Sequence, residues 1–304
     1  MSLDSIDSRP IVCYGEILYD VFPDKKLIGG APFNVAQRIH SLNYPSILVS
    51  RVGNDSDGKQ ALSFLQKQKI PVDFIQQDKN HPTGRVEVTL DKGNPIYHIL
   101  KHVAWDYIEC SNDLNHLVSK SKALIFGSLS SRCPQSRQTL SKLIPLAKNN
   151  VFDVNLRDPY YDQPLIKDLI EKTNFLKCND FELEILCRYY SITFRELKSQ
   201  MKELINKTNL EHICVTLGSS GAILYFNQRF YSDDGFPVKV VDTVGAGDSF
   251  LGTLIHGLYT HSGTQPQQVL EKANAIGAIV ASKSGANPTI DQNEINQLID
   301  CRTQ

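Results

Sequence analysis

Short apolar stretches alternate with longer amphipathic ones along most of the 304 residues. The apolar stretches have the length of strands and lie at 11–14, 46–52, 122–127, 151–154, 174–178, 212–217, 222–226 and 238–241. The amphipathic stretches carry apolar residues at helical spacing and lie at 33–42, 58–69, 134–148, 181–189, 193–206, 246–259, 266–282 and 292–300. Strands that alternate with helices are typical of a mostly parallel sheet with helices on both faces, so the pattern predicts an α/β fold.

One segment interrupts this alternation. Within 84–91, Val86, Val88 and Leu90 alternate with polar residues, and a second extended stretch follows at 96–101. The pair predicts a β-hairpin with one covered face and one face in water. On these residues alone, an ordinary hairpin at a sheet edge is favoured over a flap that covers a binding site. No linker rich in Pro, Gly or Ser divides the chain, so a single domain is expected over residues 1–304.

The segment from Val241 to Phe250 combines a glycine turn with a carboxylate. Gly245 and Gly247 allow backbone N–H groups to approach an anion, and the helical spacing that follows puts them at the positive end of a helix. Asp248 lies in the first turn of that helix, where it could accept the proton of an attacking hydroxyl. An Asp there also stabilises the helix dipole without any chemistry. The segment alone therefore leaves a capped helix and a phosphoryl-transfer site equally open.

A second glycine pair precedes the helical stretch at 33–42. Gly29 and Gly30 allow a ligand to lie against the backbone, and Asn34 offers an amide donor and acceptor beside them. Asp20 adds a carboxylate that can accept hydrogen bonds from two sugar hydroxyls. These groups suit a polyol, whereas the alternative is a Gly-Gly hairpin turn with Asn34 as a helix cap.

Polar residues also follow three of the expected strands. Arg157 could bind phosphate oxygens with two hydrogen bonds, although an Arg in such a place is often a surface ion pair. Asn179 and Glu182 have the spacing of a capping box, and a Glu beside a triphosphate can also bind hydrated Mg²⁺. Gly218 and Gly221 bound a turn that is suited to packing a nucleotide.

Composition and absent motifs narrow the chemistry. Lys plus Arg number 32 and Asp plus Glu 33, so the net charge of −1 argues against nucleic acid and membrane surfaces as partners. The chain lacks a P-loop motif, a Gly-x-Gly-x-x-Gly motif after a strand and a His-Glu-x-x-His motif. The seven cysteines have no Cys-x-x-Cys spacing, and the first ten residues lack the pattern of a signal peptide. A cytoplasmic protein that acts on small molecules is therefore expected.

Taken in chain order, these segments resemble the ribokinase-like, phosphofructokinase B type family of carbohydrate kinases over nearly the whole chain. The two signature regions of that family correspond to residues 29–34 and 242–248, and four shorter marks occur in order at 52–55, 153–155, 179–182 and 216–218. The resemblance implies a three-layer αβα fold with a mostly parallel central sheet and a small β-sheet lid. The lid would be formed by about 15–31 and 82–107, which reverses the preference for an edge hairpin.

The resemblance also implies a role for each matching position. Asp248 would be the base that takes a proton from the sugar hydroxyl, and the anion hole for the γ-phosphoryl group would be formed by Gly245, Ala246 and Gly247. The residues that would hold the sugar are Asp20, Gly29, Gly30, Asn34 and Arg157. Those that would line the ATP site are Asn179, Thr216, Gly218, Gly221 and Asn274. Glu182 would bind Mg²⁺ through water, and Asp242 with the loop 285–289 is a candidate site for K⁺.

Within the family, the blocks 15–20, 29–34 and 104–106 look most similar to those of bacterial fructokinases. The chain lacks the Lys-Gly pair that ribokinases carry in the first signature, and it has Gly-Ser-Leu at 127–129 where ribokinases tend to place a sugar-binding Glu. D-Fructose is therefore the expected acceptor, with ATP as the donor.

Two alternatives stay open at this point. The first is 2-keto-3-deoxygluconate kinase or another sugar or nucleoside kinase of the same family, and the second is a non-catalytic sugar-sensing protein. Exposed edges of the lid strands also make a homodimer through the lid an expectation.

Overall fold

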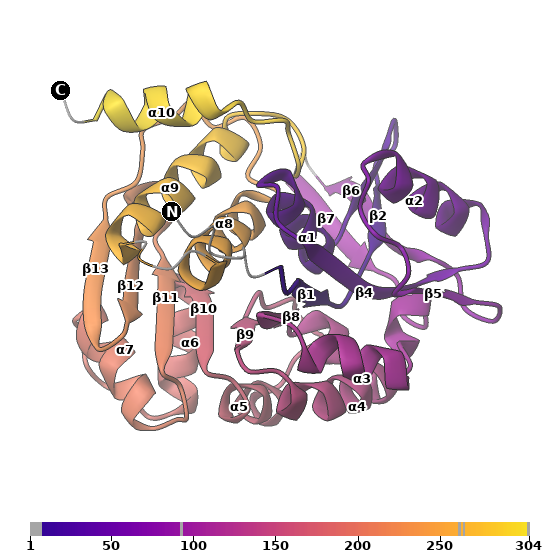
Figure 1. The fold of residues 1–304 in the computed structure, drawn as a ribbon, viewed down its shortest axis with the longest axis horizontal. Coiled ribbons are helices and arrows are strands. Elements are labelled where there is room, and N and C mark those ends of the chain that lie inside the picture. Colours follow the sequence, from indigo (N-terminus) through magenta and orange to yellow (C-terminus); the bar gives the residue numbers. More distant parts are fainter. Residues whose placement is uncertain (1–7, 92–93, 261–262, 264, 303–304) are drawn as a thin grey trace, which may run out of the picture.

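The computed structural model describes residues 8–91, 94–260, 263 and 265–302. These residues form a nine-stranded sheet and a separate four-stranded sheet (Figure 1). The strands of the large sheet are β1 (Ile11–Tyr14), β4 (Ser46–Gly53), β5 (Ile75–Asp78), β8 (Ala123–Gly127), β9 (Asn150–Asp153), β10 (Phe175–Asn179), β11 (His212–Thr216), β12 (Ala222–Phe226) and β13 (Arg229–Asp233). Their order across the sheet is β13-β12-β11-β10-β9-β8-β1-β4-β5. The strands from β5 to β11 in this order pair in parallel, and β12 and β13 add antiparallel pairs at one edge.

Helices cover both faces of the large sheet. One face carries α1 (Ala31–Ser41), α2 (Ser56–Lys67), α8 (Ala246–Thr260) and α9 (Pro266–Ala281), with α10 (Gln292–Asp300) packed on α9. The other face carries α3 (Asn112–Ser119), α4 (Pro134–Leu143), α5 (Gln163–Glu171), α6 (Asp180–Tyr189) and α7 (Leu197–Asn206). Short 3₁₀ helices lie at Ala104–Tyr107, Leu129–Ser131, Ile144–Leu146 and Gly218–Ser220. The expected three-layer αβα fold is confirmed.

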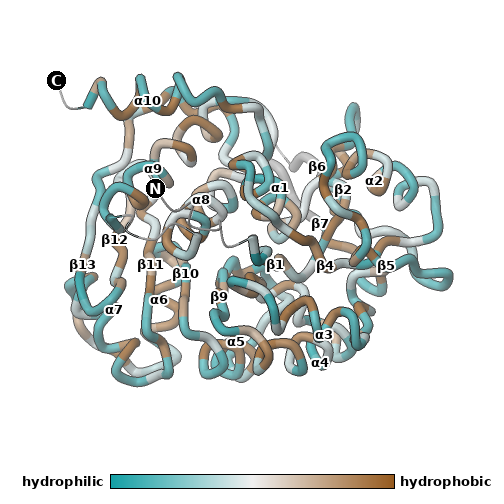
Figure 2. The backbone as a smooth tube through the Cα atoms, in the orientation of Figure 1, coloured by the Kyte–Doolittle hydropathy of each residue, from teal (hydrophilic) through white to brown (hydrophobic). Residues whose placement is uncertain are grey.

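Strand β1 shows how the sequence builds the layers. Ile11 and Cys13 are buried in the cluster under α1 and α8, whereas Val12 and Tyr14 are buried in the cluster under α3 to α7. Successive side chains of a strand point to opposite faces, so an apolar residue at every position of β1 serves two cores. Figure 2 shows hydrophobic colouring along parts of many sheet strands and at intervals along the helices that cover the sheet.

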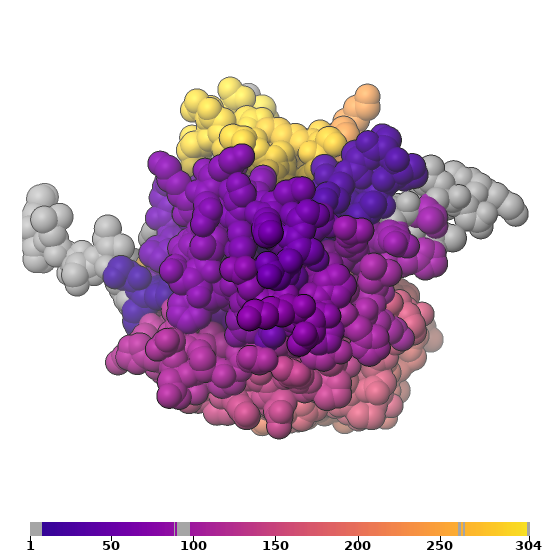
Figure 3. Space-filling model, turned by 90° about the vertical axis from the view of Figure 1, so that its right-hand side faces the viewer, coloured from indigo at the N-terminus to yellow at the C-terminus, as the bar shows by residue number. Residues whose placement is uncertain are grey.

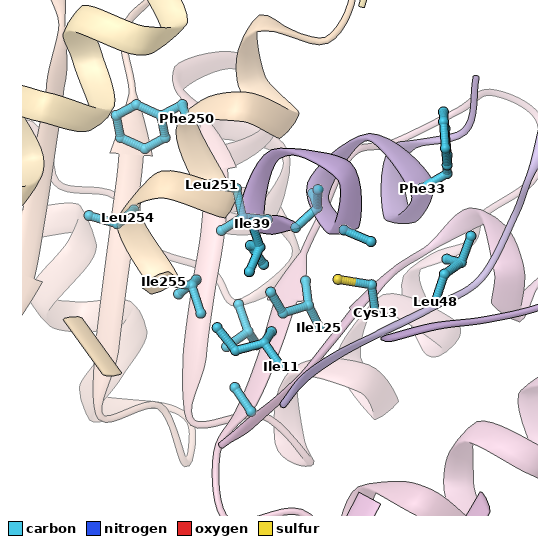
Figure 4. Close-up of a cluster of buried hydrophobic side chains, with 14 of the residues drawn as sticks. Ile11, Cys13, Phe33, Ile39, Leu48, Ile125, Phe250, Leu251, Leu254 and Ile255 are labelled. Atoms are coloured by element: carbon cyan, nitrogen blue, oxygen red, sulfur yellow. The ribbon is translucent and has the colours of Figure 1, made fainter. Parts of the chain in front are cut away.

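Helix α8 is firmly anchored in one of these cores. Phe250, Leu251, Leu254 and Ile255 are at most 4% exposed. Leu251 and Ile255 point toward α1 and β1, whereas Phe250 and Leu254 lie on the other side of the helix (Figure 4). Burial of each such side chain contributes roughly 1.5–3 kcal/mol to folding. The position of the first turn of α8 is therefore set by the packing of the turns that follow it.

The four-stranded sheet lies beside the large one and contains β2 (Leu18–Val21), β3 (Lys26–Gly29), β6 (Gly84–Asp91) and β7 (Asn94–Ile99) in the order β3-β2-β6-β7. Strands β2 and β6 pair in parallel, and the two outer pairs are antiparallel. Figure 3 views this side of the molecule, where residues from the first hundred positions, indigo to violet, make up most of the face.

A buried carboxylate connects the small sheet to the rest of the protein. Asp57 of α2 binds Lys26 of β3 at 2.5 Å and Arg85 of β6 at 2.8 Å. Both cations come from the small sheet, and the Asp57 side chain is only 3% exposed. The four strands fall within 15–31 and 82–107, the segments expected to form a lid.

Several elements differ from the sequence prediction. The strand predicted at 238–241 is wrong, because Val240 and Val241 are 57% and 60% exposed and belong to no sheet. The N–H groups of Val241 and Asp242 instead donate to the carbonyl of Ala281 at the end of α9. Strands β5 and β13 and helices α3 and α5 were not predicted. The residues 92–93 of the expected hairpin and the N-terminal residues 1–7 lie outside the described part of the chain.

Candidate active site

The carboxyl ends of the parallel strands all lie at the same end of the large sheet. After β1 the chain first adds β4 and β5 on one side of it and then adds β8 and the later strands on the other side. Ligands of open α/β sheets bind at this kind of position. The first turns of α1 and α8 come to the same place, since the side chains of Asn34 and Asp248 are hydrogen-bonded to each other.

The glycine turn before α8 has a backbone that only glycine accepts readily. Gly245 has a φ of +78°, and a Cβ built there would lie 2.3 Å from the carbonyl oxygen of Ala286. The loop 285–289 is thus pressed against the start of α8. The first N–H groups of a helix have no partners within the helix, so this end of α8 can bind an anion, and Ala246 N donates to the Thr243 carbonyl at 3.3 Å.

Asp248 is held at this turn by two amides. Its Oδ2 accepts a hydrogen bond of 2.7 Å from Asn34 Nδ2, and Asn34 Oδ1 in turn accepts one of 2.6 Å from Asn287 Nδ2. Burial and the nearby charge of Asp153 raise the pKa of Asp248 to about 6, although Asn34 lowers it in part. A carboxylate with this pKa is ionised at neutral pH and can still accept a proton there.

The glycine pair and Asp20 form the next part of the site. A Cβ built on Gly29 would lie 2.8 Å from Asp20 Oδ2, and one built on Gly30 would lie 2.4 Å from the carbonyl oxygen of Glu16. Gly30 also has a φ of +115°. Burial raises the pKa of Asp20 to about 6, while the charge of Arg157 lowers it. The glycines thus leave room for a carboxylate and a ligand on the strands of the small sheet.

Arg157 and Glu16 carry the remaining charge on this side. Arg157 is exposed. The positive charge of its guanidinium acts on three carboxyl groups and lowers the pKa of Glu16, Asp20 and Asp248. Glu16 is only 4% exposed, and burial raises its pKa to about 7. Glu16 was not predicted as a site residue, although a carboxylate directly after the first apolar strand was a signal.

A second charged cluster lies at the ends of β9 and β10. Lys177 Nζ is 3.0 Å from Asp153 Oδ1, and both side chains are buried. The two oxygens of Glu182 accept hydrogen bonds of 2.9 Å from the N–H groups of Leu156 and Asn179. With the return bond from Glu182 N to Asn179 Oδ1, this confirms the predicted capping box. Lys177 was missed, although a lysine inside the apolar stretch predicted at 174–178 was a signal.

The residues expected at the ATP site form two groups. Gly221 has a φ of +81° and packs against Asp233, whose Oδ1 accepts a hydrogen bond of 2.7 Å from Asn274. Gly221 and Asn274 are therefore brought together through Asp233. Thr216 ends β11 next to the end of β10, where Asn179 begins α6.

Asp242 connects the two loops beside the glycine turn. Its carboxylate accepts hydrogen bonds from Val244 N at 3.0 Å and from Gly285 N at 3.1 Å. In the described residues, no group of three or more His, Cys, Asp or Glu side chains is arranged to hold a metal ion. The same residues contain no helix that is long and apolar enough to span a membrane.

Comparison with known proteins decides the family. The family model described as "pfkB family carbohydrate kinase" matches residues 8–293. The chain belongs to this family. It is therefore a sugar phosphotransferase, and the resemblance found in the sequence is confirmed.

Individual pfkB relatives match over almost their full length. A fructokinase of Solanum tuberosum is 30% identical over 309 residues, with 94% of each chain covered. The structure of an uncharacterized sugar kinase from Pyrococcus horikoshii matches with a TM-score of 0.79 and 25% identity, covering 95% of this chain and 99% of that one. A fructokinase double mutant from Vibrio cholerae, solved with fructose, ADP and potassium ion, has a TM-score of 0.82 at 21% identity, with 97% and 99% covered. Because the identity is only 21%, this last comparison supports the fold alone.

Proposed function

We propose that this pfkB kinase transfers the γ-phosphoryl group of ATP to a hydroxyl of D-fructose. The observation that carries the proposal is the pairing of Asp248, a carboxylate with a raised pKa, with the glycine turn at the start of α8. A base and an anion site on one helical turn can act on the two ends of a single transfer step. The fructokinases among the relatives support fructose as the acceptor.

In the proposed mechanism, ATP supplies the phosphoryl group and the protein positions the reactants. Asp248 accepts the proton of the attacking hydroxyl, and the N–H groups of Gly245, Ala246 and Gly247 stabilise the charge on the transferred group. Asp20, Gly29, Gly30 and Asn34 hold the sugar, with Arg157 beside them. Asn179, Thr216, Gly218, Gly221 and Asn274 line the nucleotide site. The small sheet closes as a lid and excludes water.

The donor set near the nucleotide suits a hydrated magnesium ion. Each Glu182 oxygen accepts one backbone hydrogen bond and keeps a second lone pair, and among the described residues Asp153 Oδ2 has no partner. Mg²⁺ retains several waters and needs few protein carboxylates, so Glu182 would hold it through water. Asp242 is the proposed carboxylate of a K⁺ site, with the loop 285–289 on its other side.

The function is tested by measuring ADP release over a panel of acceptors. The panel is fructose, ribose, tagatose, 2-keto-3-deoxygluconate, adenosine and fructose 1-phosphate, each at the same ATP concentration. We expect the highest kcat/KM with fructose. A higher value with another acceptor would identify the substrate as another member of the family's range, and sugar binding without any ADP release would favour the sugar-sensing alternative.

The pH dependence of turnover is a separate expectation. Asp248 must be ionised to accept a proton, so kcat should be constant above its pKa of about 6 and fall about tenfold per pH unit below it. Asp20 has a raised pKa in the same range, so the profile is best repeated in Asp20→Asn. A kcat that stays constant down to pH 4.5 in both proteins would exclude Asp248 as the base.

Replacing Asp20 should weaken the binding of the sugar and leave the binding of the nucleotide unchanged. We expect Asp20→Asn to raise the KM for fructose about tenfold or more, because a hydrogen bond to a charged group contributes about 1.5–3 kcal/mol. The affinity for ATP, measured by calorimetry without sugar, should stay the same. The matched control is Asp24→Asn, an exposed carboxylate in the loop between β2 and β3. An unchanged KM in Asp20→Asn would remove this residue from the sugar site.

The proposal extends to assembly and location. Leu27 on the outer strand β3 is 39% exposed, and such a strand edge can pair with that of a second copy, so we propose a homodimer through the lid. Sedimentation of the protein as a monomer at micromolar concentration would exclude it.

The seven cysteines are unpaired, which favours a reducing compartment such as the cytoplasm.

A further inference from the structure

A buried ammonium group lies at the start of α8, where the electrostatics of the helix oppose it. The nearest atom from another part of the chain to a Cβ built on Gly247 is Lys177 Nζ, at 3.4 Å. The N-terminus of a helix carries a partial positive charge, so a cation there is unfavourable unless an anion compensates both. Lys177 is only 7% exposed, so water does little to screen this repulsion.

Three carboxylates act on the charge of Lys177. Burial disfavours the ammonium form, but the charges of Asp153, Glu182 and Asp248 outweigh it and raise the pKa of Lys177 above its usual value. The distance of 3.0 Å between Lys177 Nζ and Asp153 Oδ1 is that of an ion pair. Glu182 already accepts two backbone hydrogen bonds, and Asp248 is bonded to Asn34, which leaves Asp153 as the direct partner of Lys177.

The ammonium group of Lys177 has N–H donors that are not used by the described residues. It has three N–H donors, and in the described part of the chain one of them is used, in the bond of 3.0 Å to Asp153 Oδ1. The backbone sets this pair, because Lys177 and Asp153 are Cα partners in the register of β10 and β9. Lys177 is therefore fixed with its remaining donors next to the glycine turn.

We infer that Lys177 is a phosphoryl-binding residue that donates to the transferred group when it lies on the Gly245–Gly247 turn. This inference rests on the proposed function and adds to the site a side chain that joins the backbone donors. Asp153 acts as a positioning residue that orients the ammonium group. A phosphoryl oxygen on this turn would accept hydrogen bonds from the unused donors of Lys177 and from the N–H groups at the start of α8 at the same time.

The test compares variants that remove the charge without leaving its partner unpaired. Lys177→Met alone would bury an unpaired Asp153 carboxylate, so it is combined with Asp153→Asn, and Asp153→Asn alone is the reference. The matched control is Lys172→Met, which removes the lysine of a surface Lys–Asp pair on α5, at 2.6 Å from Asp168. Thermal unfolding establishes that each variant is folded.

Two readouts separate phosphoryl binding from a structural role. The first is the affinity for a non-hydrolysable ATP analogue relative to ADP, which should fall about tenfold or more in Lys177→Met/Asp153→Asn. Affinity for ADP itself should change less than about threefold, because Lys177 faces only the terminal group. The second is kcat, which should fall by about 10²–10³ with little change in the KM for the sugar. Lys177→Arg should restore part of kcat.

The outcomes also distinguish this inference from the proposed function. If no acceptor yields ADP but the analogue-to-ADP ratio still depends on Lys177, the sugar kinase proposal fails and the phosphoryl-binding role holds. An unchanged ratio and an unchanged kcat relative to Asp153→Asn would overturn the role of Lys177. A parallel loss of affinity for the analogue, ADP and sugar would assign it a structural role instead.

Discussion

Asp248→Asn is expected to lower kcat by about 10²–10⁴ while the protein still folds and binds both substrates. The amide has nearly the same shape, and its oxygen can still accept the hydrogen bond from Asn34 that holds the side chain of Asp248. What is lost is the ability to accept a proton. The measurement is kcat from ADP release, with sugar and nucleotide affinities from calorimetry.

The matched control is Asp113→Asn. Asp113 is also an acidic residue in the first turn of a helix, but it is exposed on α3 and outside the proposed site. Both substitutions remove a favourable interaction with a helix dipole, which costs about 0.3–1 kcal/mol. Near-normal turnover in Asp248→Asn would show that its carboxylate only stabilises the helix.

Gly245→Ala is expected to lower kcat at least about 10²-fold and to lower the melting temperature as well. The new Cβ would lie 2.3 Å from the carbonyl oxygen and 2.6 Å from the Cα of Ala286, and neither backbone atom can move aside by a side-chain rotation. The loop 285–289 must therefore shift. Since Asn287 of that loop binds Asn34, the shift would reach the amide that holds Asp248.

The control for this substitution is Gly263→Ala. Gly263 has a similar φ of +87°, but a Cβ built there would meet no atom of the described residues within 4 Å. Both variants carry the cost of a left-handed backbone for a non-glycine residue, about 1–2 kcal/mol. Only Gly245→Ala adds the collision, so equal losses of stability and unchanged kcat in both variants would show that the turn tolerates a side chain.

The sequence predicted the sheet because the strands of a parallel sheet need apolar residues on both faces. In β1 every residue is apolar and every residue is buried, so its limits were predicted correctly. The segment 238–241 is also mostly apolar, apart from Lys239, but it pairs with no strand of the described residues, and its Val240 and Val241 are exposed. Local composition cannot show whether a partner strand exists.

The candidate site was predictable where glycines and carboxylates occur in one short segment. Gly245 and Asp248 belong to such a segment, and the structure places their turn beside Asn34, as an anion site with a base requires. Lys177 is different, because its importance depends on Asp153 in the adjacent strand and on Gly247, seventy residues later. Contacts between distant segments are not visible in a single sequence without its fold.

In the proposed mechanism, Asp248 and Asp20 contact the same sugar from parts of the protein with very different support. Asp248 stands on a helix whose following turns are buried in the core, whereas Asp20 stands on a narrow sheet at the side of the molecule, joined to α2 through Asp57. Exposed positions of this sheet, such as Leu27, can therefore be substituted at less cost to folding than the buried positions of α8. On the proposed mechanism, the acceptor preference can change at such positions while the turn that carries out the transfer is kept.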